Sequence, residues 1–250
     1  MNRATYISSY LIYRDVNDEV IRAVSGALLN RLYLDQPIPR DKFAEVVYEE
    51  AIPLNGIPTT EVVKMARREH VDAFFRDGSL RLGNFRYYNQ YDQEEIGDRQ
   101  EGSFILVGNC PPTTAFVEIG GGFDNYIYCC FAGEPDPNCL GRFGYDAGMR
   151  IRDIAGFTEA VAEKIQSEKH WYSKCAYSRD KVVVGSVDAD FDFGTISSRL
   201  LDLTSEAKYF VKPDKYAHQC EYRFVWKMPG DVTEPLDLKC PEAIQFCETL

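Results

Sequence analysis

The sequence lacks any apolar run long enough to cross a membrane, for which a helix needs roughly 18 consecutive apolar residues. The opening stretch, MNRATYISSYLIYRDVNDEV, has no continuous apolar segment of the kind that follows the basic residues of a secretory signal peptide. We therefore expect a cytoplasmic protein without a membrane partner.

Metal-binding and phosphate-loop patterns are also missing. The three histidines, His70, His170 and His218, stand apart from any ligand-like spacing, and the eight cysteines form no C-x-x-C pair. Without a secretory signal, we expect these cysteines to be reduced thiols and the protein to bind no metal. The run IGGGF lacks both the P-loop pattern and the spaced glycines of a dinucleotide fingerprint, so a flexible turn explains it better.

Positive charge is scarce, because the 250 residues carry a net charge of −11. This argues against a nonspecific grip on nucleic acid, which depends on Lys and Arg neutralising phosphates. A local basic pocket is still compatible with that balance, although a solvated charged face is the simpler interpretation of each basic cluster. The candidates are Lys64, Arg67, Arg68, Arg81 and Arg86. Aromatic residues make up 13% of the chain and offer surfaces on which a flat ligand can stack.

The N-terminal part, residues 1–58, is predicted to be a helical leader. In NDEVIRAVSGALLNRLYLD an apolar stripe follows the capping residues Asn17 and Asp18. Such a leader either packs on the main body or docks on a partner such as an antitoxin or other regulatory protein, and the pattern is compatible with both.

From residue 59 to residue 250 the pattern changes to strands with few helices. EVVKM is predicted as a strand before a helix that ends at Gly78, in preference to one long helix. Further strands are predicted for SLRLGNF, SFILVG, TTAFVEIG, NYIYCCFA, FGYDAGMRIRD and EYRFVWKM, a helix for GFTEAVAEKIQSEKH, and a hairpin for KCAYSRDKVVVGSV. This order indicates an α+β fold with a mixed or mainly antiparallel sheet.

Two segments carry more polar and aromatic residues than folding requires. In the first, FFRDGSLRLGNFRYYNQYDQEEIGDRQEG, a strand leads into a loop rich in Tyr, Asp and Glu, for which a hydrated loop is the alternative interpretation. In the second, KYAHQCEYRFVW, strand geometry would place Gln219, Glu221 and Arg223 on one side and Tyr222 and Phe224 towards the core. An ordinary polar strand entrance is the alternative there.

The order of these segments resembles that of a widespread bacterial family of uncharacterised domains, which is expected to adopt an ADP-ribosyltransferase-like fold. The resemblance runs from about Thr60 to Met228. Its most specific parts are the G-S-L-R-L-G strand, the D-x-x-E-G loop and the K-Y-A-x-Q-x-E-Y-R-F block. It implies split β-sheets with flanking helices, and NAD bound as a substrate in a cleft between two small sheets.

The resemblance also implies roles for individual residues. Glu221 would be the catalytic carboxylate, hydrogen-bonded to a ribose hydroxyl and stabilising an oxocarbenium-like centre, and Gln219 would position the acceptor. A basic residue, Lys64 or Arg67, would contact the NAD phosphate or ribose, with Arg81 as a further basic candidate. The nicotinamide would stack on tyrosines, for which the candidates are Tyr87, Tyr88 and Tyr145.

Two departures from the pattern of toxin-type transferases bear on this mapping. YIYCCF stands where a Ser-Thr-Ser motif is common, and the first strand carries no histidine. The leading hypothesis is an NAD-dependent ADP-ribosyltransferase, a bacterial toxin or phage-defence effector that modifies a macromolecule, either nucleic acid or protein. The alternatives are an NAD glycohydrolase and a non-catalytic module that senses nucleotides or binds a partner and in which Glu221 merely pairs with Lys or Arg.

Overall fold

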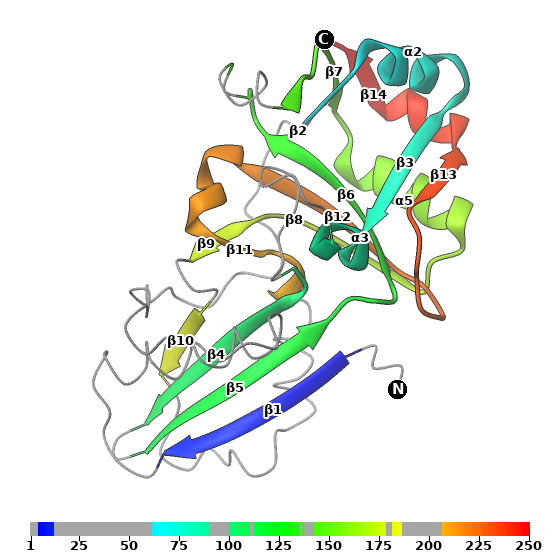
Figure 1. Ribbon diagram of the computed structural model, residues 1–250. Helices are drawn as coiled ribbons and strands as arrows, with labels where there is room; N and C mark the ends of the chain where they lie inside the picture. Colours follow the sequence, from blue (N-terminus) through cyan, green and yellow to red (C-terminus); the bar gives the residue numbers. More distant parts are fainter. Residues whose placement is uncertain are drawn as a thin grey trace.

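The computed structural model describes residues 5–12, 62–90, 101–110, 113–135, 137, 143–178, 182–186 and 207–250. These residues form an α+β fold with one large antiparallel sheet, a four-stranded sheet and a two-stranded parallel pair. Figure 1 shows the four-stranded sheet below the large sheet, whose outer side carries α2 and α5. The prediction of an α+β chain with a mainly antiparallel sheet is confirmed.

The large sheet is organised around the apolar strand β6. Its strands are β2 (Val62–Ala66), β3 (Ser79–Asn84), β6 (Asn125–Ala132), β7 (Ala147–Ile151), β8 (Lys169–Lys174), β12 (Glu221–Lys227), β13 (Leu236–Lys239) and β14 (Cys247–Thr249). Strand β12 pairs along one edge of β6, while β2 and β3 pair with opposite ends of its other edge. Because both of its edges are paired, β6 is a central strand, and its side chains are buried or half-buried, as its apolar sequence predicts.

The two smaller sheets are formed by segments far apart in the chain. The four-stranded sheet has the order β1 (Thr5–Ile12), β5 (Thr113–Gly121), β4 (Ser103–Cys110) and β10 (Val182–Ser186). The parallel pair consists of β9 (Ala176–Ser178) and β11 (Val211–Pro213). This pair carries Lys212 and Tyr177, two residues that reach the candidate site.

The structure contains short helices and 3-10 turns, and local sequence explains where two of the helices begin or end. The described helices are α2 (Arg68–Asp77), α3 (Phe85–Gln90) and α5 (Ile154–Ile165), and the 3-10 turns are η1 (Ala207–Tyr209), η2 (Asp214–Gln219) and η3 (Pro241–Phe246). Asp153 caps α5 by accepting a hydrogen bond from the Gly156 backbone N–H at 2.8 Å. Helix α2 ends at Gly78 with φ of 75°, where a Cβ atom would lie 2.3 Å from the backbone of Cys240, so this position requires glycine.

Two apolar clusters lie on opposite faces of the large sheet. Because alternate residues of a strand point to opposite faces, Tyr222, Phe224 and Trp226 of β12 join the cluster that packs against α2, α5 and η3. Val225 instead joins a smaller cluster with Phe85, Ile127, Tyr209 and Phe210. Residue Arg223 shares this second face of β12, which leads to the candidate site.

Three predictions made from the sequence differ from the structure, and the structure adds four strands that the sequence patterns did not predict, β8, β11, β13 and β14. Thr5–Ile12, at the start of the predicted helical leader, is a strand that pairs with β5, and the predicted helix over NDEVIRAVSGALLNRLYLD lies outside the described residues. KCAYSRDKVVVGSV is not a hairpin, because β9 pairs with β11 while β10 pairs with β4. The residues after β3 begin helix α3 instead of a loop, because the Asn84 Oδ1 accepts a hydrogen bond from the Tyr87 N–H at 2.7 Å.

The other predicted strands are confirmed, including the division of EVVKMARREHVDAFFRDG into β2 and α2. The two predicted helices that lie within the described residues are confirmed as α2 and α5, although α5 ends at Ile165 and the end of GFTEAVAEKIQSEKH begins strand β8. No helix within the described ranges combines the length and the apolar character needed to cross a bilayer.

The first prediction concerns the aromatic core beside β12. Phe224 is fully buried and its ring lies 5.3 Å from Phe157 and 6.0 Å from Trp226, centroid to centroid. Phe224→Ala should lower the free energy of unfolding by about 3–5 kcal/mol, because it removes apolar burial and leaves a cavity. Chemical denaturation measures this loss. Lys169→Ala, at an exposed position of the neighbouring strand β8, should change it by less than about 0.5 kcal/mol, and a comparable loss there would contradict the assignment.

Candidate functional site

A pocket lies where β2, β6 and β12 of the large sheet meet α3, β11 and η2. It spans about 600 Å³ of space between the protein atoms, and this figure includes space that is open to solvent. Its lining combines charged side chains with aromatic rings and two thiols: Lys64, Met65, Tyr88, Glu101, Cys129, Cys130, Phe131, Phe143, Tyr145, Lys212, Gln219, Glu221 and Arg223.

The Gln-Cys-Glu segment forms the turn between η2 and β12. Cys220 adopts a left-handed conformation with φ of 41°, which is uncommon for a residue with a Cβ atom. The turn leaves the Cys220 side chain exposed, while Gln219 and Glu221 on either side are buried and line the pocket. Cys220 thus separates Gln219 from Glu221, and its geometry directs both neighbouring side chains into one pocket.

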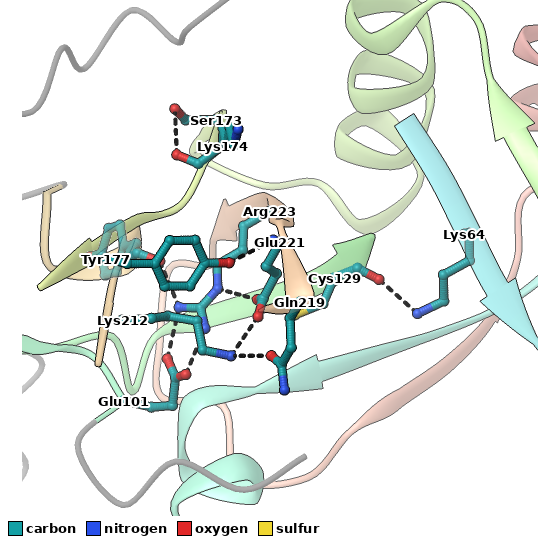
Figure 2. A network of polar contacts seen from close by, with 11 residues as sticks. Lys64, Glu101, Cys129, Ser173, Lys174, Tyr177, Lys212, Gln219, Glu221 and Arg223 are labelled. Atoms are coloured by element: carbon teal, nitrogen blue, oxygen red, sulfur yellow. Dashed lines mark hydrogen bonds and ion pairs between the residues drawn. The ribbon is translucent and has the colours of Figure 1, made fainter. Parts of the chain in front are cut away.

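Arg223 makes the most extensive set of contacts in the site. Its guanidinium donates to both oxygens of Glu101 at 2.7 and 2.6 Å, to the Oε1 of Glu221 at 2.5 Å and to the Tyr209 carbonyl at 2.7 Å. Figure 2 shows the guanidinium between the two carboxylates. Because the side chain is only 1% exposed, each of these contacts replaces a hydrogen bond to water.

Lys212 extends this network from β11. Its Nζ donates to the Oε2 of Glu221 at 2.5 Å and to the Oε1 of Gln219 at 2.9 Å. Both oxygens of the Glu221 carboxylate therefore face a cation, one from Lys212 and the other from Arg223. The backbone N–H of Glu221 donates to the Tyr177 hydroxyl at 2.6 Å, which fixes the start of β12 as well.

The protonation states of the network follow from its pairing. Burial by itself raises the pKa of Glu221, but the adjacent Arg223 and Lys212 outweigh that effect and hold the pKa well below its ordinary value. Burial lowers the pKa of Lys212, and the Glu221 carboxylate more than reverses it. The pocket therefore contains a carboxylate that stays ionised although it is almost completely removed from water.

Lys64 supplies a further positive charge on the opposite side of the pocket. Its Nζ donates to the Cys129 carbonyl at 2.8 Å and lies 4.5 Å from the centre of the Tyr128 ring. Within the described part of the chain, this ammonium has no carboxylate partner. The lining then holds three cations (Lys64, Lys212, Arg223) against two carboxylates (Glu101, Glu221), a net charge of +1 that suits an anionic ligand.

Aromatic rings form the remaining wall. Phe143 and Tyr145 stack with their centroids 5.2 Å apart and their planes 5° from parallel, and Phe131 meets Phe143 edge-on. Tyr88 is held close to β3, because Gly83 leaves room for its ring. Burial raises the pKa of the Tyr88 hydroxyl well above its ordinary value, so it remains a neutral hydrogen-bonding group.

The structure brings five of the sequence-predicted site residues into this pocket, namely Lys64, Tyr88, Tyr145, Gln219 and Glu221. It does not bring Arg67, Arg81 or Tyr87 there. Arg67 is an exposed residue at the start of α2, and Arg81 pairs with Asp237 of β13 at the surface. Tyr87 contacts Tyr88 edge-on but does not line the pocket.

Sequence reasoning missed Lys212 and Glu101 as site residues. Lys212 lies three residues before the K-Y-A-x-Q-x-E block, and its only signal is a lysine directly after the apolar YFV. Glu101 belongs to the D-x-x-E-G loop, where a hydrated loop was the alternative interpretation. Each joins the site through a contact with a residue distant in the chain or in another element, which no local pattern reveals.

Among the described residues, no group of three or more His, Cys, Asp or Glu side chains is placed to hold a metal ion. Comparisons with protein-family models, with curated proteins and with solved structures gave no match.

The second prediction compares a buried with an exposed arginine pair. Arg223→Met leaves Glu101 and Glu221 buried with too little positive charge, so the free energy of unfolding should fall by about 3–5 kcal/mol. Arg81→Met breaks the pair with Asp237, whose two side chains are 61% and 71% exposed, and should cost less than about 1 kcal/mol. Urea denaturation of both variants measures the two free energies of unfolding. Similar losses would show that the buried network stabilises the fold no more than the exposed ion pair does.

Proposed function

We propose that the protein is an NAD-dependent ADP-ribosyltransferase that modifies a macromolecule. The observation that carries this proposal is the convergence of Lys64, Tyr88, Tyr145, Gln219 and Glu221 on one pocket. These residues come from separate segments of the chain, and the resemblance described above implies a role in ADP-ribosyl transfer for each of them. NAD fits the lining in kind, because it combines flat rings for an aromatic wall with a negative charge for a lining of net charge +1.

Glu221 acts on the nicotinamide ribose. The bond between the ribose C1 and the nicotinamide nitrogen breaks, nicotinamide leaves with the bonding electrons, and positive charge develops at C1. An ionised carboxylate that water does not screen stabilises that charge. The nucleophile of the acceptor then forms the new bond to C1 and releases its proton to solvent water, to which the pocket is partly open.

Gln219 and Lys64 bind the two reactants. The amide of Gln219 orients the acceptor, and the ammonium of Lys64 pairs with a phosphate of NAD. By the resemblance described above, a Gln at this position goes with acceptors other than arginine, so an amide side chain or a nucleobase is the expected target. A transferase with such a target would act as a toxin or as a phage-defence effector.

One observation favours a second function, a module that binds a nucleotide without turning it over. Lys212 and Arg223 take one oxygen each of the Glu221 carboxylate, which is the arrangement of a structural ion pair. Each carboxylate oxygen has a second lone pair. A ribose hydroxyl can therefore still donate to Glu221 in the transferase, and only turnover distinguishes the two functions.

The third prediction is the fate of labelled NAD incubated with the pure protein and candidate RNA, DNA and protein acceptors. Transfer of the label to an acceptor supports the transferase, whereas release of free ADP-ribose identifies an NAD glycohydrolase. NAD that binds but stays intact identifies the binding module, and NAD that neither binds nor reacts contradicts the proposal altogether.

Two variants assign the roles in the same assay. Glu221→Gln should lower kcat by about 100-fold or more, because the amide carries no charge to stabilise the transition state. Gln219→Ala should reduce transfer more than hydrolysis, since Gln219 acts on the acceptor. Thermal unfolding and NAD affinity of both variants must be measured in parallel, because each change disturbs the buried network. Wild-type turnover in folded Glu221→Gln would exclude Glu221 as the catalytic carboxylate.

The fourth prediction tests Lys64 against its neighbour Arg67. Lys64→Met should raise the KM for NAD about tenfold, the equivalent of one lost charge-assisted hydrogen bond, with kcat changed less. Arg67→Met removes an exposed charge only three residues away and should leave both constants unchanged. Equal effects of the two substitutions would mean that general electrostatic attraction, and not the pocket, binds the phosphate.

A further inference from the structure

The side chain of Lys212 contacts both Gln219 and Glu221, the two residues that flank Cys220 in the Gln-Cys-Glu turn. A single ammonium donates to the Gln219 amide at 2.9 Å and to the Glu221 carboxylate at 2.5 Å. Its side chain is 5% exposed and its Nζ lies 4.7 Å from the centre of the Tyr216 ring. Two of the three protons of the ammonium are thus used to hold the two functional groups together.

The β9–β11 pair that carries Lys212 also holds the backbone of Glu221. Val211 and Pro213 pair with Ala176 and Ser178 on either side of Lys212. From the same pair, Tyr177 accepts a hydrogen bond from the Glu221 N–H, and the neighbouring Cys175 N–H donates to the Glu221 carbonyl at 2.8 Å. This small sheet therefore fixes Glu221 at its backbone and at its side chain.

The backbone of the turn directs both side chains into the pocket, and a contact between their polar ends adds to what the backbone fixes. Gln219 ends a 3-10 turn and Glu221 begins a strand, with Cys220 between them in the left-handed region at φ of 41°. The relative position of the amide and the carboxylate then depends also on a residue that bridges them. In the described structure that bridge is Lys212, as Figure 2 shows.

We propose that Lys212 is a positioning residue, which fixes the Gln219 amide relative to the Glu221 carboxylate so that acceptor and ribose meet in one geometry. This inference rests on the proposed function for its kinetic consequence. The bridge between Gln219 and Glu221 does not depend on the proposed function.

Lys212 also completes the charge balance of the site. Glu101 and Glu221 carry two negative charges, and Arg223 and Lys212 carry two positive charges. Lys64 adds a positive charge elsewhere in the lining. Five further titratable groups around Glu221 are neutral, because burial raises the pKa of each: Tyr88, Cys129, Cys130, Cys175 and Tyr177. Removing the Lys212 charge therefore leaves Arg223 shared between two carboxylates.

The fifth prediction separates positioning from charge by kinetics. Lys212→Met should lower kcat by at least tenfold with little change in KM, and Lys212→Arg should restore part of the loss. The double variant Lys212→Met with Glu101→Gln returns the network to charge neutrality but lacks the bridge, so its kcat should stay low. Lys215→Met is the matched control, because Lys215 is exposed and its Nζ also lies 4.7 Å from the Tyr216 ring.

An NMR titration tests the bridge without any turnover. With ¹³C-labelled glutamate, the Glu221 carboxyl signal is assigned by its loss in Glu221→Gln. Between pH 8 and pH 4 the Glu221 carboxyl should stay ionised in the wild type. In Lys212→Met its pKa should be higher than in the wild type, because one of its two cationic partners is lost. The side-chain NH₂ of Gln219 should become mobile in both Lys212→Met and the charge-neutral double variant, whose ¹⁵N relaxation measures that motion.

The outcomes distinguish this inference from the proposed function. If the wild type neither binds nor cleaves NAD, the proposed function fails, and the NMR results alone still decide whether Lys212 holds the pair. Unchanged Glu221 titration and Gln219 mobility in folded Lys212→Met would overturn the bridge. A raised KM with normal kcat would show instead that Lys212 binds the ligand directly, and recovery of wild-type kcat in the double variant would show that it acts only through charge.

Discussion

The buried guanidinium of Arg223 is the constraint on which the rest of the site depends. It binds Glu101 at the start of the four-stranded sheet, Glu221 on its own strand and the carbonyl of Tyr209 in η1. These contacts join the large sheet to the four-stranded sheet at one point. A buried charge without partners is very costly, and the Arg223 guanidinium is paired with the carboxylates of Glu101 and Glu221. Two carboxylates carry one negative charge more than Arg223 neutralises, and the ammonium of Lys212 balances that charge.

The balance of these buried charges determines the net charge that a ligand meets in the pocket. The four charges of Glu101, Arg223, Glu221 and Lys212 balance, which leaves the ammonium of Lys64 as the net charge that a ligand meets. Glu221 stays ionised without a water shell, in a position set by two cations and a backbone hydrogen bond. Such preorganisation is what electrostatic catalysis uses, and it is also what a rigid binding site uses. The structure thus accounts for the state of the carboxylate independently of the reaction proposed for it.

Local patterns predicted much of the fold. The alternation in EYRFVWKM identified β12 and correctly separated Glu221 and Arg223 from Tyr222 and Phe224, because side-chain direction in a strand depends only on position. The apolar run NYIYCCFA identified the buried strand β6 for the same reason. Partner choice was not predictable: β9 and β10 are adjacent in sequence but belong to different sheets, since pairing depends on segments far along the chain. Helix α3 was missed because its start depends on a single cap, Asn84.

The sequence by itself determined which residue types meet at the turn: an amide and a carboxylate on either side of one spacer, followed by an arginine on the face of the carboxylate. It also determined that Lys64 follows an apolar strand entrance and that tyrosines follow the Gly-Ser-Leu-Arg-Leu-Gly strand. Only the tertiary structure decided that Lys64, Tyr88 and Tyr145 share the pocket while Arg67, Arg81 and Tyr87 do not. It alone supplied Lys212 and Glu101, because ion pairs between different elements of the fold follow from the folded path of the chain and leave no periodic trace in its sequence.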